Sequence, residues 1–294
     1  MAMRIFEILI IYLGAYILLL AILKLWGKGR KFVLKQLIIA GDKDFENKRY
    51  NQRIKKLNWL IRLNPIPSNY SLRAGAFSSL EQYDNAIKDI SKAIDINPYY
   101  ADFYRSRAYY YSKIEKNDLA VKDYNSAIDL KFNLKDYYYL FLFRAQSFED
   151  NNEYQLAIND YDIAIKNIPD EIEAYTGKGF CLFKLEKYDD ALSCYQKAVE
   201  LDNNSFWAFY NRGELFYHLK KVNEALQDLN KALELRPTTE SSSLFLWLGV
   251  LYAVDGKDNE TAMSFLQKAK ELGHNDAQEC INELNNTGKI IMEW

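Results

Sequence analysis

The sequence predicts an all-α protein in which a solenoid of antiparallel helix pairs follows one transmembrane helix. Three observations predict this architecture: an apolar segment near the beginning of the sequence, alanines that recur at a regular spacing after it, and prolines that fall between the recurring units. With 294 residues, of which 49% are hydrophobic, the chain also has enough apolar mass to fold without a metal or a disulfide framework.

The apolar segment spans residues 5–26, after a tail of residues 1–4, and its charged residues are Glu7 and Lys24. About 20 apolar residues let a helix cross a hydrocarbon layer of ~30 Å, so we expect residues 5–26 to span a membrane. A cleaved signal peptide is the alternative, but the segment ends without a small-residue cleavage motif. An uncleaved anchor is therefore predicted.

Basic residues follow this segment, in and around a linker of residues 27–33. Lys28, Arg30 and Lys31 lie in the linker, whereas Arg4 is the basic residue before the segment. Because positively charged flanks stay on the cytoplasmic side, we expect a single-pass membrane protein whose later residues are cytoplasmic.

Alanines recur in pairs seven residues apart throughout the rest of the chain. Successive pairs are offset by 34, 37, 34, 34 and 37 residues: Ala86 and Ala93, Ala120 and Ala127, Ala157 and Ala164, Ala191 and Ala198, Ala225 and Ala232, Ala262 and Ala269. An aromatic residue followed four residues later by alanine or glycine precedes each pair, as in Tyr175 and Gly179. Both spacings fit one face of a helix, so each unit is predicted to contain two helices.

Proline marks the end of the second helix in four units, at Pro65, Pro98, Pro169 and Pro237. Proline cannot donate the next backbone hydrogen bond and disfavours helix in the residue before it.

These alanines, aromatics and prolines resemble the tetratricopeptide repeat family, whose 34-residue unit has small residues at positions 8, 20 and 27 and proline at position 32. Six good copies follow a degenerate copy at 34–66 and together span residues 67–276: 67–100, 101–134, 138–171, 172–205, 206–239 and 242–276. Residues 277–294 are expected to form a closing helix and an apolar tail. The resemblance implies a right-handed superhelical solenoid with a concave groove that binds a protein or peptide partner.

Arginine and aspartate recur sixteen residues apart in four copies: Arg73 and Asp89, Arg107 and Asp123, Arg144 and Asp160, Arg212 and Asp228. The copy at 172–205 has Lys178 and Cys194 instead, so the acid and the arginine disappear together. This covariation predicts a structural ion pair, within one repeat or between adjacent repeats. A row of active-site acids is the alternative, which copying along a solenoid disfavours.

Composition argues against several functions. The 38 basic and 40 acidic residues are mixed along the chain and give a net charge of -2, whereas a nucleic-acid-binding protein normally needs a basic face, so no nucleic-acid partner is expected. Cys181, Cys194 and Cys280 lack metal-site spacing and are predicted to be small buried residues, and His218 and His274 have no evident nucleophile partner. We expect no enzymatic activity, catalytic residue, cofactor, metal or small-molecule substrate.

The leading hypothesis is a membrane-anchored scaffold or adaptor. Two alternatives stay open: an accessory or regulatory subunit of a membrane enzyme or export complex, and an enzyme with an unrecognised site.

The groove is expected on the first helix of each repeat. An α-helix turns by ~100° per residue, which puts repeat positions 4, 7, 8 and 11 on one side of the first helix. The opposite side of that helix then carries positions 2, 5, 9, 12 and 13. That side carries the predicted partner-binding residues: Arg105, Tyr109, Tyr139, Leu142, Phe180, Phe183, Trp207, Tyr210, Tyr217 and Leu246. They predict an aromatic groove for an apolar or aromatic peptide, without the family's basic clamp for a carboxylate terminus. Burial of these rings against the next repeat or against the tail, 290–294, is the alternative.

Overall fold

The computed structural model describes residues 49–130, 137–237, 241–254 and 258–290. They belong to two compact units, Met1–Phe132 and Asn133–Trp294. Among the described residues, no helix is both long enough and apolar enough to cross a membrane. The anchor predicted at residues 5–26 and the linker at 27–33 lie outside the described residues.

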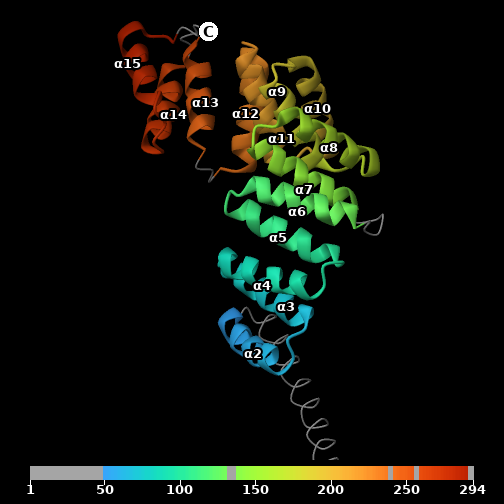
Figure 1. Cartoon of the computed structure of the whole chain (residues 1–294). Coiled ribbons are helices and arrows are strands. Elements are labelled where there is room, and N and C mark those ends of the chain that lie inside the picture. The colour runs from blue at the N-terminus through green and yellow to red at the C-terminus, as the bar shows by residue number, and fades with distance from the viewer. Residues whose placement is uncertain (1–48, 131–136, 238–240, 255–257, 291–294) are drawn as a thin grey trace, which may run out of the picture. The chain divides into compact units, whose positions relative to one another are not determined.

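In the first unit, the described residues form five helices (Figure 1). They are α2 (Tyr50–Leu63), α3 (Pro67–Ser78), α4 (Tyr83–Ile96), α5 (Ala101–Lys113) and α6 (Asn117–Asp129). Each of α3 and α5 packs chiefly on the helix that follows it, and α4 packs on α5. The unit is thus a stack of helix pairs.

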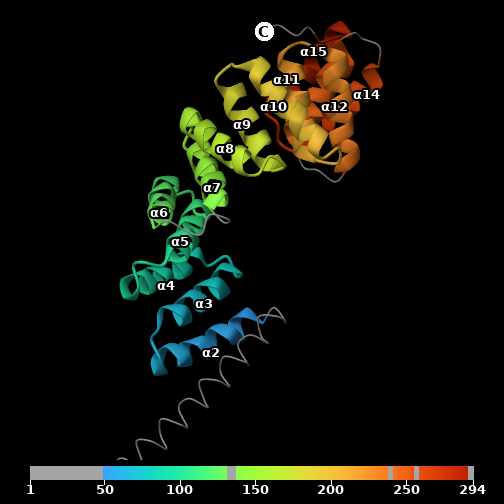
Figure 2. The same ribbon diagram turned by 90° about the vertical axis from the view of Figure 1, so that its right-hand side faces the viewer.

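The second unit repeats this pattern and ends in an additional helix (Figures 1 and 2). Its helices are α7 (Tyr137–Asp150), α8 (Tyr154–Asn167), α9 (Ile172–Lys184), α10 (Tyr188–Leu201), α11 (Phe206–His218), α12 (Val222–Leu235), α13 (Ser242–Val254), α14 (Asn259–Glu271) and α15 (Ala277–Thr287). The pairs are α7 with α8, α9 with α10, α11 with α12, and α13 with α14. The prediction of an all-α solenoid of paired helices is confirmed.

Small residues set the close approach of the two helices in a pair. Ala191 and Ala198 of α10 are 0% exposed. On the facing helix, a Cβ added at Gly179 would lie 2.6 Å from the Tyr195 ring, closer than packed atoms come. Here the recurring small residues serve packing, as the spacing predicts.

In five of the described pairs, the turn between the two helices contains a residue with left-handed backbone conformation. Glu81, Glu115, Asn152, Glu186 and Lys220 have φ between 58° and 61°. They stand at the same position of their repeats and close the same turn. In the turn before α10, for example, the backbone N–H of Lys187 donates to the Leu182 carbonyl at 2.9 Å. These side chains hold a conformation that glycine adopts without steric cost.

The prediction of structural ion pairs is confirmed, and the pairs lie within repeats. Arg107 donates from Nε and Nη2 to the two carboxylate oxygens of Asp123 at 2.6 and 2.8 Å. The same two-bond geometry joins Arg73 with Asp89, Arg144 with Asp160, and Arg212 with Asp228. Each aspartate is buried, so the pair fastens the first helix to the second.

The exceptional repeat uses the neighbouring repeat instead. Lys178 forms an ion pair of 2.6 Å with Asp162, on the second helix of the preceding repeat. Because Cys194 supplies no carboxylate within the repeat, the Lys178 side chain contacts the preceding repeat instead. Arg107 reaches in both directions, because its Nη1 also donates to Ser91 of the preceding repeat at 3.1 Å. The joint loss of the arginine and the aspartate in this repeat is therefore explained by the ion pair that they form in the other repeats.

At the end of the second unit, α15 turns one face to the solenoid. Ala277, Ile281 and Leu284 are buried there. Ile290 is 4% exposed, and its backbone N–H donates to the Ala253 carbonyl at 3.3 Å. The segment after α15 thus covers the end of α13; residues 291–294 lie outside the described part.

Candidate functional site

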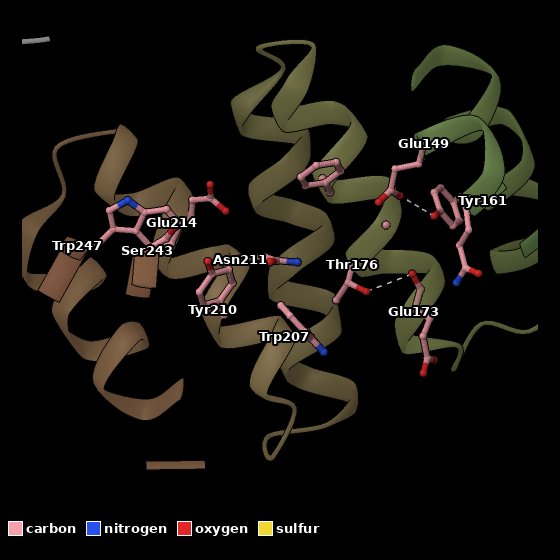
Figure 3. A pocket seen from close by; sticks show the side chains of 13 residues that line it. Glu149, Tyr161, Glu173, Thr176, Trp207, Tyr210, Asn211, Glu214, Ser243 and Trp247 are labelled. Atoms are coloured by element: carbon pink, nitrogen blue, oxygen red, sulfur yellow. Dashed lines mark hydrogen bonds between the residues drawn. The ribbon is translucent and has the colours of Figure 1, made fainter. Parts of the chain in front are cut away.

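The second unit contains a groove formed mainly by the first helices of four successive pairs. Along this unit α7 contacts α9, α9 contacts α11, and α11 contacts α13. The groove has a volume of about 570 Å³ and is lined by Gln146, Glu149, Tyr161, Glu173, Thr176, Gly177, Phe180, Trp207, Tyr210, Asn211, Glu214, Ser243 and Trp247 (Figure 3).

The lining follows the repeat. Positions 2, 5, 6 and 9 of α9 and of α11 all contribute: Glu173, Thr176, Gly177 and Phe180, then Trp207, Tyr210, Asn211 and Glu214. Residues three or four apart lie on the same face of a helix. One face of each first helix therefore points away from its own partner helix and lines the groove.

Aromatic side chains form one part of the wall. Trp207 is 53% exposed, although it is a large apolar ring. The Tyr210 ring lies 5.7 Å from the Trp207 ring and 5.3 Å from the Trp247 ring, measured between centroids. These three rings form a continuous surface across α11 and α13 (Figure 3).

Carboxylates form another part of the wall. Burial raises the pKa of Glu149 to about 7, and burial also raises the pKa of Glu214. The Lys184 ammonium acts against this rise at Glu214. Glu173 differs: its hydrogen bond with Glu171 lowers the pKa of Glu173 and raises that of Glu171 to about 7. Of the three carboxylates that line the groove, Glu173 is therefore the one most firmly ionised near neutral pH.

A hydrogen-bonded cluster lies at the α8 and α9 side of the groove. The Tyr161 hydroxyl donates to the Glu149 carboxylate at 2.8 Å, and the Cys181 Sγ lies 3.8 Å from the same oxygen. Burial, with the nearby Glu149 charge, raises the pKa of Cys181, so the thiol stays protonated and is a poor nucleophile. Gly177 makes room for the cluster, because a Cβ there would overlap the Tyr161 ring.

The cysteines fit their predicted packing role only in part. Cys181 is buried, whereas Cys194 and Cys280 are partly exposed. None of the three forms a disulfide.

The structure brings together three of the ten predicted partner-binding residues, Phe180, Trp207 and Tyr210. Leu142, Tyr217 and Leu246 are instead packed in the core, with exposures of 4, 7 and 6%. These three side chains fit the alternative, burial against neighbouring repeats, because each belongs to a buried apolar cluster whose residues come from more than one repeat.

The other four predicted residues lie outside this groove. Phe183 packs against His218, with ring centroids 5.1 Å apart, and Tyr139 stacks on Phe143 at 6.3 Å. In the first unit, Arg105 pairs with Asp102 at 2.7 Å, and Tyr109 is 43% exposed with Lys113 over its ring.

Sequence reasoning missed the carboxylates. Glu173, Glu214 and Glu149 occupy positions 2, 9 and 12 of their repeats, which the helical spacing already assigned to the groove side. Counting acids as well as aromatics at these positions could have found them. Position 6, occupied by Gly177, Asn211 and Trp247, was not assigned to the groove and lines it.

Comparisons with known proteins agree on the repeat type. One family model, described as TPR repeat, matches residues 181–220, and two described as tetratricopeptide repeat match residues 67–100 and 206–239. The small glutamine-rich tetratricopeptide repeat-containing protein 2 of Saccharomyces cerevisiae is 41% identical over 69 residues, which cover 22% of this chain and 19% of the yeast protein. The match thus spans about a fifth of that relative's length.

Solved structures agree on the fold. A tetratricopeptide repeat protein from Parabacteroides merdae superposes with a TM-score of 0.67 at 16% identity, covering 85% of this chain and 98% of that one. YrrB, described as a TPR protein with an unusual peptide-binding site, superposes with a TM-score of 0.50 at 23% identity, covering 67% of this chain and 97% of its own.

Proposed function

Because this chain carries tetratricopeptide repeats, we propose that it is a protein-interaction scaffold and that the groove of the second unit binds a peptide segment of a partner. The observation that carries the proposal is the ring surface of Trp207, Tyr210 and Trp247. A large ring left 53% exposed at Trp207, within a groove of about 570 Å³, offers area that a partner can bury. YrrB, which has this fold, is described as having a peptide-binding site, which supports the same role.

We propose binding rather than catalysis. The nucleophile candidate nearest the groove carboxylates, Cys181, has a raised pKa and is buried. Glu149 has a pKa of about 7, but the two groups that contact its carboxylate, the Tyr161 hydroxyl and the Cys181 thiol, both have raised pKa values and give it no activated nucleophile.

Alanine variants of Phe180, Trp207 and Tyr210 test the proposal. The full chain is crosslinked in cells and the captured proteins are identified by mass spectrometry, while circular dichroism measures the melting temperature. We expect each variant to capture less partner, because its binding free energy weakens by roughly 2 kcal/mol or more. The melting temperature should change little. Tyr99→Ala is the matched control, because Tyr99 is 83% exposed and lies outside the groove. Early melting with retained capture would place these rings in the core and the binding surface elsewhere.

We further propose that residues 5–26 tether the scaffold to a membrane, with the repeats on the cytoplasmic side. The apolar length of this segment and the basic linker after it support the proposal. The full chain is expected to resist alkaline carbonate and to dissolve in detergent, whereas a chain without residues 1–33 is expected to stay in the aqueous fraction. Carbonate extraction of the full chain, or a C-terminal reporter active only outside the cytoplasm, would overturn it.

A further inference from the structure

The groove of the second unit has a one-sided charge. The described residues that line it include three carboxylates, Glu149, Glu173 and Glu214, and no lysine or arginine. The sequence predicts an apolar or aromatic occupant, but such a segment would cover Glu173 and Glu214 without compensating their charge. Burying an unpaired charge is costly, so the occupant that fits is one that brings positive charge.

Glu214 is the central acid of this arrangement. It lies on α11 one turn after Tyr210, and its side chain lines the groove beside Trp247 (Figure 3). Within the described part of the chain, Glu214 makes no hydrogen bond or ion pair, and the counter-charge acting on it is that of Lys184. Its carboxylate is therefore available to accept from a donor that enters the groove.

Two rings of the groove, Trp207 and Phe180, already have a cation over them within the molecule. The Arg236 guanidinium lies 4.5 Å from the Phe206 centroid and 5.6 Å from the Trp207 centroid, and the Lys184 ammonium lies 5.0 Å from the Phe180 centroid. Aromatic faces attract such groups through their quadrupole. A carboxylate beside aromatic rings can hold the head of a basic side chain and its aliphatic stem together.

In the described part of the first unit, the corresponding face of α5 does not carry this negative charge. There Arg105, at position 5, already pairs with Asp102, at position 2, at 2.7 Å. The same positions of α11 hold Tyr210 and Trp207, with Glu214 at position 9. Charge complementarity therefore assigns a basic occupant to the second unit's groove and not to the first unit.

We propose that the groove binds a peptide segment that carries arginine or lysine, with the basic head on Glu214 and its stem against Trp207 and Tyr210. This inference rests on the proposed function and names the partner chemistry. Glu173, the acid with a lowered pKa, adds a second negative charge along the same wall.

Fluorescence anisotropy on the full chain in a non-ionic detergent tests it with three labelled peptides of one length. The peptides share their apolar residues, and their polar residues are all arginine, all serine or all glutamate. We expect the arginine peptide to bind at least about tenfold more tightly than the serine peptide and the glutamate peptide to bind most weakly. Raising the salt concentration should weaken the arginine peptide most.

Variants locate the contact. Glu214→Gln is expected to weaken the arginine peptide by about tenfold and to leave the serine peptide unchanged, because the amide keeps the shape and removes the charge. Glu200→Gln is the matched control, since Glu200 is an exposed acid of the same unit outside the groove. Trp207→Ala should weaken all peptides that bind.

The outcomes separate this inference from the proposed function. If the serine or glutamate peptide binds as tightly as the arginine peptide and Trp207→Ala abolishes binding, the groove binds peptides but the basic partner is wrong. An arginine peptide that is insensitive to both Glu214→Gln and Trp207→Ala also overturns the inference, because it binds elsewhere. If no peptide binds and cellular capture is unaffected by the groove variants, the proposed function fails as well.

Discussion

The Tyr161 hydroxyl donates a 2.8 Å hydrogen bond to the Glu149 carboxylate, joining the second helix of one repeat to the end of its first helix. Glu149 is enclosed by this contact and by Cys181 of the next repeat, and burial raises its pKa to about 7. A carboxyl group with a pKa so close to neutrality makes the stability of the second unit depend on pH.

We expect stability to fall as the pH rises through neutrality. The folded-state pKa of Glu149, about 7, lies above the ordinary value of 4.5, so the folded chain keeps a proton that the unfolded chain has lost. This contribution is fully present below pH 4.5 and is lost as the pH rises through about 7. Glu149→Gln should remove on the order of 2 kcal/mol of the pH dependence.

Urea unfolding at a series of pH values, followed by tryptophan fluorescence, measures this dependence. Glu153→Gln is the control, because Glu153 is an exposed acid close in sequence. Parallel stability curves for the wild type and Glu149→Gln would show that Glu149 is ionised normally.

Gly177→Ala should destabilise the second unit by about 2 kcal/mol. The added Cβ would overlap the Tyr161 ring and force it away from Glu149, which breaks a part-buried hydrogen bond. Gly75→Ala is a matched control, because a Cβ at Gly75 meets no atom within 4 Å. There alanine should be neutral or stabilise helix α3 by up to about 1 kcal/mol. Thermal unfolding by circular dichroism compares them, and equal melting of both variants would contradict the close contact.

Arg107→Ala and Asp123→Ala should each destabilise the first unit by about 3 kcal/mol. Each variant leaves a charge without its partner, and Asp123 is buried. The double variant should lose less than the sum of the single losses, because the remaining charge is also removed. Unfolding free energies of the four proteins complete the cycle. Strict additivity would mean that the pair has no coupling energy.

Glu186→Gly should stabilise the turn between α9 and α10 by about 0.5 to 1 kcal/mol. Glu186 has φ of 60°, where a Cβ is disfavoured and glycine is not. Part of the gain is offset by the greater freedom of glycine in the unfolded chain. Glu186→Ala keeps the Cβ and should change little, whereas Glu186→Val should destabilise. A lower melting temperature for Glu186→Gly than for Glu186→Ala would contradict the strain at this turn.

The amino-acid sequence alone predicts the paired helices and the ion pairs between arginine and aspartate, and the structure places each of these pairs within one repeat. Both depend on short-range order: alanines seven apart share a helix face, and arginine and aspartate sixteen apart meet when one helix turns back on the next. The proline positions agree, since Pro98, Pro169 and Pro237 each follow a helix by two residues. The anchor at 5–26 remains a prediction, because it lies outside the described residues.

Which residues line the groove together depends on the packing of neighbouring repeats, which the spacing along one helix does not predict. Leu142, Tyr217 and Leu246 have groove-side spacing but are buried, whereas Trp207 and Tyr210 line the groove with Glu214. The position of a residue along one helix gives the direction in which its side chain points from the helix axis. How much of that side chain the neighbouring repeats cover depends on contacts between residues distant in sequence, and the same burial sets the pKa of Glu149.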